Sequence, residues 1–337
     1  MSSITKQIVK NIERLDAATF ERALASATGQ HRFDAATAAF LSRQLTYIRA
    51  QTLQVKHAPL NAFTVFPVQT EIPQGASTAL QYVYDMVGMA KIIANPADDL
   101  PFVDALAEEW PVSVKEVGAA YGYSVSELEQ AAFANVSLST MKSDAVKRAI
   151  DTKLNKIAWN GDAAANIIGF LDNENVSEYA LTADGTGSAT TLSSKTAEKQ
   201  YRDVANLIET IGENTNETED ANTILFAPAP YRALSTTLYT TANGQTTQTV
   251  LQMLKAHYPQ ITRWLKVGEL HNADATGTKD LMIAGFFDPS YIRFEIPLRF
   301  EQRPVQENNL SFKIPCRSKV AGVTVFRPYC FTKSVGA

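Results

Sequence analysis

The feature that most restricts the fold is a long, mostly polar helix with one narrow apolar stripe, predicted between Ser124 and Trp159. Ser124 and Glu127 have the spacing of a capping box, which marks the beginning of a helix. The apolar members of the stripe recur at helical spacing: Val146, Ile150, Leu154 and Ile157. Charged residues fill the other positions, and an interruption is expected at residues 135–137. We interpret this region as a spine helix whose charges form a solvated face and not a binding site.

The stretch that follows this helix, NGDAAANIIGFLDNENV, admits two interpretations. Its acidic and amide side chains could hold a metal ion or a phosphate, or the stretch could simply end the helix. We favour a helix end formed by Asn160, Gly161 and Asp162, because glycine readily adopts the left-handed conformation of a helix cap. The apolar residues after it are then expected to seat the chain on the core: Ile167, Ile168, Phe170 and Leu171.

A β-hairpin is predicted earlier in the chain, from Phe63 to about Ile93. Residues 72–75 contain the proline and glycine of a type I turn, and the residues after it alternate with the period of a strand. Each face carries both apolar and polar residues, which indicates an extended arm that packs on neighbours instead of burying one face within its own domain. Two strands of an ordinary sheet are the alternative. The candidate intersubunit residues of this hairpin are Glu71, Pro73, Gly75, Tyr82, Tyr84 and Asp85.

A Gly/Ser/Thr-rich stretch, TADGTGSATTLSSKT, separates this first part from a second lobe. The second lobe alternates helices and strands: a helix at residues 201–211, a buried strand at 224–227, and short helices at 231–238 and 249–258. Residues 292–300 alternate apolar and charged residues, which predicts one half-buried strand. The final strands are expected to return to the sheet of the first lobe, and the fold class is therefore α+β.

The composition argues against several classes of protein. The chain has 337 residues, of which 45% are hydrophobic and 20% charged, as in globular proteins of about two domains. Its net charge is −4 without a run of Lys or Arg, which argues against sequence-directed binding of nucleic acid. No stretch approaches the ~18 apolar residues of a membrane span, so we expect no membrane partner and synthesis in the cytoplasm. Cys316 and Cys330 are expected to be buried free thiols.

No catalytic, cofactor or metal site is predicted. The four histidines are scattered, and neither a zinc motif nor the nucleophile motif of serine hydrolases occurs. The acidic residues at 98–104 are expected to form a solvated turn, and residues 184–187 lack the Gly-Lys-Ser/Thr ending of a phosphate loop. Residues 1–61 contain two amphipathic helices, either an arm or two ordinary domain helices. An arm, a spine helix and a separate lobe without a chemical motif favour an assembly protein.

Several segments, taken in order, resemble the major capsid proteins of tailed bacteriophages with the Hong Kong 97-type fold. These segments are FPVQTEIPQGASTALQYVYDMVGMAKIIANPADDLPFVD, YGYSVSELEQA, AVKRAIDTKLNKIAWNGD and IIGFLDNENV. The resemblance implies, in order, an N-terminal arm, an extended hairpin loop, a peripheral domain with the spine helix, an axial domain, and C-terminal strands that return to the peripheral domain. The corresponding residues are 1–61, 62–95, 96–193, 194–289 and 290–337.

The resemblance also implies a function, namely self-assembly through pentamers and hexamers into an icosahedral head that encloses double-stranded DNA. The implied partners are further copies of the chain, a portal, a separate scaffolding or decoration protein, and packaged DNA held by non-specific contact. The implied location is the virion, after assembly in the cytoplasm of the bacterial host, and no cofactor is implied. An encapsulin-type compartment shell shares this fold, and a soluble two-domain enzyme is the alternative from another class.

Overall fold

The computed structural model describes residues 56–87, 104–133, 138–184, 190–241 and 244–335. Residues 59–337 form one compact unit, whose fold is described here. Its helices are α4 (Ala62–Val65), α5 (Val125–Phe133), α6 (Leu138–Asn160), α7 (Ala197–Thr215), α8 (Pro228–Thr236) and α9 (Val250–His257), and its 3-10 turns are η1 (Ala163–Ala165), η2 (Leu192–Ser194), η3 (Gly268–Leu270) and η4 (Pro328–Cys330). Its strands are β1 (Val68–Gln69), β2 (Thr78–Val87), β3 (Asp104–Ser113), β4 (Lys115–Ser124), β5 (Ser177–Ala180), β6 (Thr223–Phe226), β7 (Leu238–Thr241), β8 (Gly244–Thr249), β9 (Arg263–Lys266), β10 (Leu281–Gly285), β11 (Ile292–Glu295), β12 (Leu298–Gln302), β13 (Gln306–Asn308), β14 (Ser311–Val320), β15 (Gly322–Val325) and β16 (Phe331–Val335).

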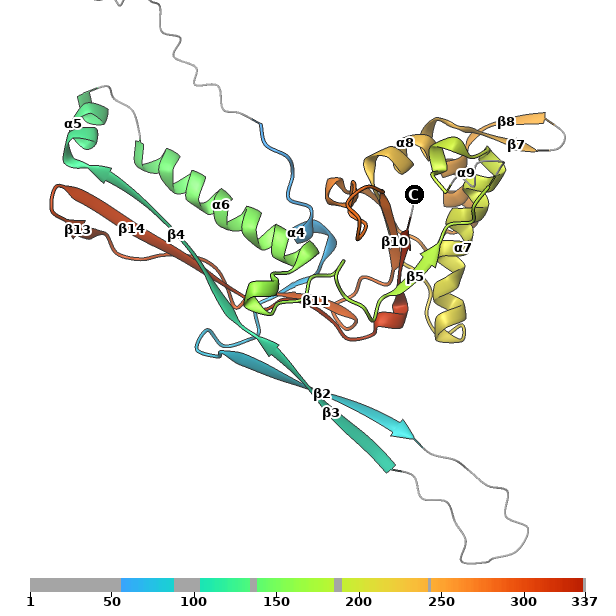
Figure 1. Cartoon of the computed structure of the whole chain (residues 1–337), viewed down its shortest axis with the longest axis horizontal. Helices are drawn as coiled ribbons and strands as arrows, with labels where there is room; N and C mark the ends of the chain where they lie inside the picture. The colour runs from blue at the N-terminus through green and yellow to red at the C-terminus, as the bar shows by residue number, and fades with distance from the viewer. Residues whose placement is uncertain (1–55, 88–103, 134–137, 185–189, 242–243, 336–337) are drawn as a thin grey trace, which may run out of the picture. The chain divides into compact units, whose positions relative to one another are not determined.

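The long helix α6 lies along an antiparallel sheet made of β4, β12, β13 and β14 (Figure 1). Strands β4 and β14 pair along their whole length, so they form a long support for the helix. The apolar stripe of α6 faces this support, because Ile150, Leu154 and Ile157 are buried in the core and Val146 packs against it. The prediction of a long helix with a narrow apolar stripe is therefore confirmed.

The predicted capping box begins α5. The backbone N–H of Glu127 donates to Ser124 Oγ at 3.1 Å, and the N–H of Ser124 donates to Glu127 Oε2 at 3.2 Å. Lys142 Nζ, near the beginning of α6, donates to the same carboxylate oxygen at 3.1 Å. This bond from Lys142 holds the pKa of Glu127 below its ordinary value. The predicted interruption at residues 135–137 lies outside the described residues.

Two strand predictions differ from the structure. Residues 292–300 form two strands in two different sheets, because Pro297 separates β11 from β12 and has no N–H for a ladder. The first half of the predicted hairpin forms α4 and the short strand β1 instead. Strand β1 pairs in parallel with β11, which in turn pairs with β15. These three strands make a small sheet in which β15 is an edge strand.

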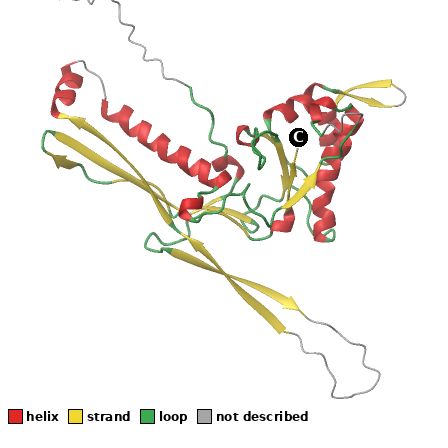
Figure 2. Cartoon of the chain, viewed as in Figure 1, coloured by secondary structure: helices red, strands yellow, loops and turns green. Residues whose placement is uncertain are grey.

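The extended hairpin is formed by β2 and β3 (Figure 2). Their register runs from Thr78 opposite Ser113 to Val87 opposite Asp104. The alternation of β2 was interpreted correctly, but its partner follows it in sequence and does not precede it. Pro111 lies within β3, and a proline is tolerated there because each strand of a two-stranded ribbon has a free edge. We refer to β2 and β3 as the arm.

The second lobe is a five-stranded sheet in the order β5-β16-β10-β6-β9, with α7 packed on it. The expected strand at residues 224–227 and the short helices α8 and α9 are present. The expected boundaries differ in two places. Strand β5 precedes residue 194, and β16 pairs with β5 and β10 in this lobe. Another C-terminal strand, β14, does return to the first lobe, where it pairs with β4. Strand β16 lies in the interior of the sheet, between β5 and β10. Its residues Phe331, Thr332 and Ser334 are fully buried there.

The two cores meet at the five-stranded sheet. Leu225 and Ile283 belong to the core beneath α6, whereas their neighbours Ile224 and Met282 belong to the core beneath α7. This alternation is what a strand buried on both faces produces. The first core is built around aromatic rings of distant segments: Phe66, Trp159, Phe170, Phe287 and Phe331. Both cysteines are buried and free, as predicted, and burial raises the pKa of each thiol.

Candidate assembly surface

The arm is fixed to the body of the subunit at its root. The backbone N–H of Val114 donates to Ser77 O at 2.9 Å, which closes the base of the hairpin. Lys319 Nζ on β14 donates to Gln74 O at 2.6 Å, just before β2 begins. Arg293 on β11 lies 3.4 Å from the carboxylate of Glu71. The root is therefore held by a few polar contacts with β11 and β14, whereas the strands of the arm extend from it.

The six residues predicted for the hairpin fall into two groups. Glu71, Pro73 and Gly75 lie at the root before β2, where the N–H of Ala76 donates to Pro73 O at 3.0 Å. The turn therefore has Gln74 and Gly75 at its centre, one residue later than predicted. The other three, Tyr82, Tyr84 and Asp85, lie on β2 itself. The side chains of Tyr84 and Asp85 lie outside the described part of the chain.

The described side chains of the arm make no contribution to either core. Leu80 is 56% exposed and Tyr82 is 53% exposed, and both belong to β2. A two-stranded hairpin is marginally stable by itself, because it buries too little apolar surface. An exposed apolar ribbon of this kind is suited to contact with another subunit.

The end of the spine helix is tightly packed. Helix α6 ends at Asn160, and Gly161 follows with a φ of 68°, the left-handed conformation expected of it. The chain then folds back, and a Cβ on Gly169 would lie 2.2 Å from the backbone nitrogen of Gly161. Lys153 Nζ donates to Asp162 Oδ2 at 2.6 Å, and this bond lowers the pKa of Asp162. The stretch is thus a structural joint.

The apolar residues after this joint are seated as expected, with one exception. Ile167, Phe170 and Leu171 are buried in the first core. Ile168 is 63% exposed, so its predicted role in the core is wrong. The reason is the fold-back at Gly169, which turns Ile168 away from the core while its neighbours face it.

A polar junction that the sequence did not reveal joins α4 and α6 to η3. Glu269 accepts bonds through both carboxylate oxygens, from Asn61 Nδ2 at 2.6 Å and from Asn155 Nδ2 at 3.0 Å. Asn155 Oδ1 accepts from the N–H of Ala62 at 2.9 Å. An asparagine within the stripe of a long helix was the available signal, since a buried amide requires hydrogen-bond partners.

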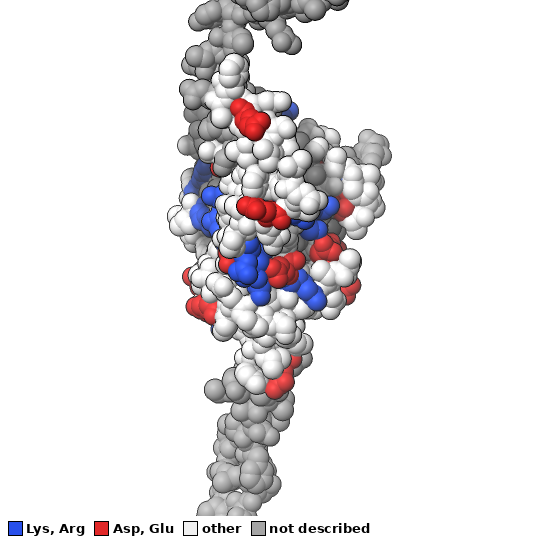
Figure 3. Space-filling model, turned by 90° about the vertical axis from the view of Figure 1, so that its left-hand side faces the viewer, with Lys and Arg blue, Asp and Glu red and all other residues white. Residues whose placement is uncertain are grey.

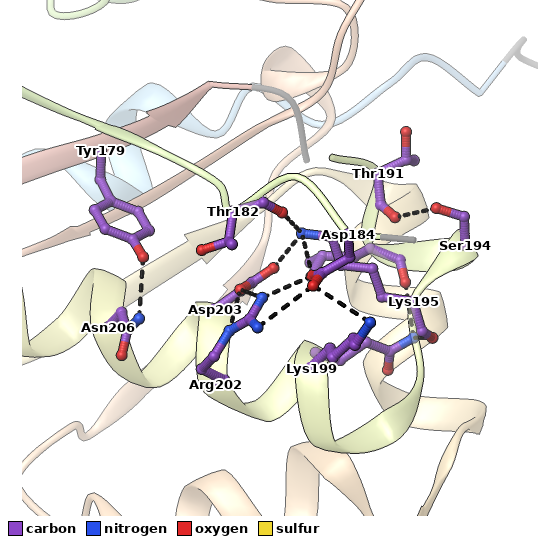
Figure 4. A network of polar contacts seen from close by, with 12 residues as sticks. Tyr179, Thr182, Asp184, Thr191, Ser194, Lys195, Lys199, Arg202, Asp203 and Asn206 are labelled. Atoms are coloured by element: carbon purple, nitrogen blue, oxygen red, sulfur yellow. Dashed lines mark hydrogen bonds and ion pairs between the residues drawn. The ribbon is translucent and has the colours of Figure 1, made fainter. Parts of the chain in front are cut away.

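A second polar network includes Asp184, the first residue of the stretch that was compared with a phosphate loop (Figure 4). Lys195 and Asp203 form a fully buried ion pair, and Lys195 Nζ also donates to Thr182 O at 2.6 Å. Arg202 Nη2 lies 2.7 Å from Asp184, and its bond lowers the pKa of Asp184 to about 2. Every charged side chain named in this network forms an ion pair with an oppositely charged side chain of the same chain. The network therefore fastens the segment before η2 to α7.

Charges of both signs are mixed on the described surface. On the face shown in Figure 3, Lys and Arg lie next to Asp and Glu, and no large area has a single sign. Among the described residues, no group of three or more His, Cys, Asp or Glu could hold a metal ion. No helix in the described ranges is long and apolar enough to cross a bilayer.

Glu295 on β11 is a buried carboxyl group near the root of the arm. It is 8% exposed, and its Oε2 has no hydrogen-bond partner among the described residues. Burial raises its pKa, while the nearby charge of Arg293 lowers it. The folded state therefore favours the protonated form of Glu295. This group stabilises the subunit fully at pH values below its unfolded-state pKa, and that stabilisation is lost as the pH rises through its folded-state pKa.

We expect Glu295→Gln to raise the free energy of unfolding at pH 8 by about 1 kcal/mol, because a neutral amide avoids the cost of a buried charge. The gain should shrink as the pH falls towards 4.5, the ordinary value for this group. Urea unfolding of the unassembled subunit at pH 5 and pH 8 measures both. Glu71→Gln, on an exposed side chain, is the control and should change stability by less than about 0.5 kcal/mol. A Glu295→Gln subunit that is less stable at pH 8 would contradict the expectation.

Comparison with solved structures defines the class of protein. The chain is similar to a structure described as the capsid of Myoviridae phage XM1, with a TM-score of 0.74 and 16% identity, over 92% of this chain and 100% of that one. A chain from Microbacterium phage Oxtober96 gives 0.60 and 12%, over 88% and 97%. A chain from Mycobacterium phage Bobi gives 0.57 and 12%, over 90% and 99%. The α+β fold is therefore that of a phage capsid subunit.

A family model agrees with this class. The model described as major capsid protein matches residues 88–334. The chain belongs to the major capsid protein family, and it is a structural protein of a viral shell and not an enzyme. A search of curated proteins gives no match.

Proposed function

We propose that this chain assembles through pentamers and hexamers into the icosahedral head of a tailed phage, with the Hong Kong 97-type fold. The observation that carries the proposal is the arm. It extends from polar contacts at its root, contributes no described side chain to either core, and exposes Leu80 and Tyr82. Such a ribbon gains stability only when another subunit covers it.

Each part of the chain has a proposed role in this assembly. The arm overlaps an adjacent subunit, and the helix α6 with its sheet forms the peripheral domain. The second lobe, including β5 and β16, forms the axial domain that meets its copies at the five-fold and six-fold axes. Residues 1–61 act as an N-terminal arm. The polar junction at Glu269 supports this division, because it ties the end of the N-terminal region to both α6 and η3.

The proposed partners are further copies of the chain, a portal, a separate scaffolding or decoration protein, and packaged double-stranded DNA. The net charge of −4 and the mixed charges of the described surface suit loose, non-specific contact with DNA. The shell is assembled in the host cytoplasm, where the two free thiols stay reduced.

Electron microscopy of the expressed chain tests the proposal. We expect closed shells whose surface shows capsomers of five and six subunits, and sedimentation should separate these shells from free subunits. A scaffolding protein encoded beside the chain is added in a parallel expression. A stable monomer or dimer under every assembly condition would contradict the proposal, as would an open sheet or tube without five-fold positions.

A further inference from the structure

The edge strand β15 carries unpaired backbone groups. The N–H of Phe326 donates to Tyr291 O at 2.8 Å, so the backbone of Phe326 faces β11. Backbone direction alternates along a strand, and Thr324, which is opposite Arg293, therefore also faces β11. Val323 and Val325 direct their N–H and C=O groups away from β11. Within the described ranges these groups have no backbone partner.

This free edge lies in a groove. One cavity of about 270 Å³ is lined by Val323, Thr324 and Val325 on one side and by the arm root from Trp110 to Ser113 on the other. It shares Trp110 and Asn175 with a second cavity of about 690 Å³, so the two are adjacent. Each cavity is lined by one exposed apolar side chain: Ile168, 63% exposed, lines the smaller cavity, and Tyr329, 65% exposed, lines the larger one.

The groove is suited to a neutral, extended peptide. The charged residues that line the larger cavity are Glu219 and Arg327. Their side chains lie 3.5 Å apart, so their charges neutralise each other. Four asparagine side chains can donate to or accept from a peptide backbone: Asn166, Asn173, Asn175 and Asn214. A free strand edge beside apolar pockets is the arrangement that proteins use for strand addition.

The arm presents a matching edge. Because Val114 N–H bonds to Ser77 O, residues 79 and 81 face β3, and Leu80 and Tyr82 direct their backbone groups outward. These are also the residues whose large side chains are exposed. The stretch from Thr78 to Tyr84 contains no charged residue, which matches the neutral groove. Strand β2 pairs only with β3 among the described strands, so its outer edge is unpaired.

We propose that the arm of one subunit adds its β2 edge to the β15 edge of a neighbouring subunit, so that Leu80 and Tyr82 occupy the groove beside Trp110. This inference rests on the proposed role of the arm and specifies where the arm binds. The partner is a second copy of this chain, because the neutral edge with two apolar side chains and the neutral groove with a free edge belong to the same sequence.

Amide hydrogen exchange tests the contact directly. The outward N–H groups of Leu80 and Tyr82, whose side chains are exposed, should exchange freely in unassembled subunits. Val323 and Val325 are 8% and 5% exposed, but their outward N–H groups have no backbone partner among the described residues, so they should exchange faster than the ladder N–H of Thr324. In shells, all four outward N–H groups should exchange more slowly by about tenfold or more, since each becomes hydrogen-bonded. Unchanged exchange at residues 323 and 325 in shells would overturn the proposal, whatever happens elsewhere in the arm.

A proline substitution provides an independent test. Val323→Pro removes an outward N–H but leaves the ladder with β11 intact, which an edge strand tolerates. Val323→Ala is the matched control, because it shortens the side chain and keeps the N–H. Losing one hydrogen bond weakens each contact about fivefold, so we expect the yield of closed shells to fall by about tenfold or more for the proline variant only. Equal yields of closed shells from two folded variants would overturn the proposal. If the proline variant does not fold, amide hydrogen exchange at residues 323 and 325 of the wild-type protein is the deciding measurement.

These outcomes separate the inference from the function on which it rests. If a subunit without the arm forms normal shells, both the role of the arm and its docking on β15 fail. A second outcome is that removal of the arm blocks assembly, while the amides of residues 323 and 325 exchange at the same rate in wild-type shells as in unassembled subunits. In that case the arm binds elsewhere, and only the present inference fails.

Discussion

A subunit in which residues 80–111 are replaced by Asn-Gly should fold and form no closed shells. Ala79 and Val112 are cross-strand partners whose backbones face each other, so a two-residue turn can join them. The described side chains of β2 and β3 belong to neither core, and therefore the free energy of unfolding should change by less than about 1 kcal/mol. Assembly should be lost because every copy lacks the surface that we propose to join it to its neighbour.

Urea unfolding and electron microscopy of the same preparation measure the two effects separately. Gly268→Ala is a suitable control away from the arm, because an added Cβ would meet no atom within 4 Å. We expect it to form normal shells. Normal shells from the arm-deleted subunit would show that the arm is not an intersubunit contact, and an unfolded deletion would show that the arm stabilises its own subunit.

Gly169→Ala should destabilise the subunit by about 4 kcal/mol or more, which is at the upper end for a single substitution. Its Cβ would lie 2.2 Å from Gly161 N, 2.4 Å from Asn160 C and 2.5 Å from Trp159 O. All three are backbone atoms at the end of α6, so no flexible side chain can move aside. The helix end or the fold-back must shift, and Phe170 next to it would leave its place against Trp159.

Urea unfolding and near-ultraviolet circular dichroism check this expectation, since the second reports the packing of the aromatic side chains, Trp159 among them. Gly268→Ala is the matched control, because a Cβ there would meet no atom within 4 Å and its stability should change by less than about 0.5 kcal/mol. A Gly169→Ala subunit within about 1 kcal/mol of the wild type would show that the joint at the end of α6 tolerates displacement.

Short sequence patterns correctly predicted the helix cap, the apolar stripe and the helix end. The capping box at Ser124, the stripe of α6, and the glycine after Asn160 depend on residues within a few positions of each other. The partner of β2 could not be predicted in this way, because a period of two identifies a strand without specifying what it pairs with. Thr78 pairs with Ser113 at the root of the arm, and neither position contains a signal for the other.

The tertiary polar contacts could not be predicted from the sequence either. Glu269 lies 208 residues from Asn61, and the two are joined only because η3 and α4 meet in the fold. Glu295 belongs to an alternating apolar and charged stretch that predicts a solvated face, yet the sheet that it enters is covered and the carboxyl group is buried. The resemblance of several segments to phage capsid proteins supplied the family, which periodicity alone did not.

Strand β16 gives the subunit a late step in its formation. Thr332 pairs with Ser177, so the two are separated by 332 − 177 = 155 residues. Contacts of such long range form slowly, because a large loop must close before they gain any stability. On the ribosome, the five-stranded sheet has a gap between β5 and β10 until residues 331–335 emerge. A nascent chain therefore lacks a finished second lobe, and it cannot join a growing shell before its synthesis has passed β16.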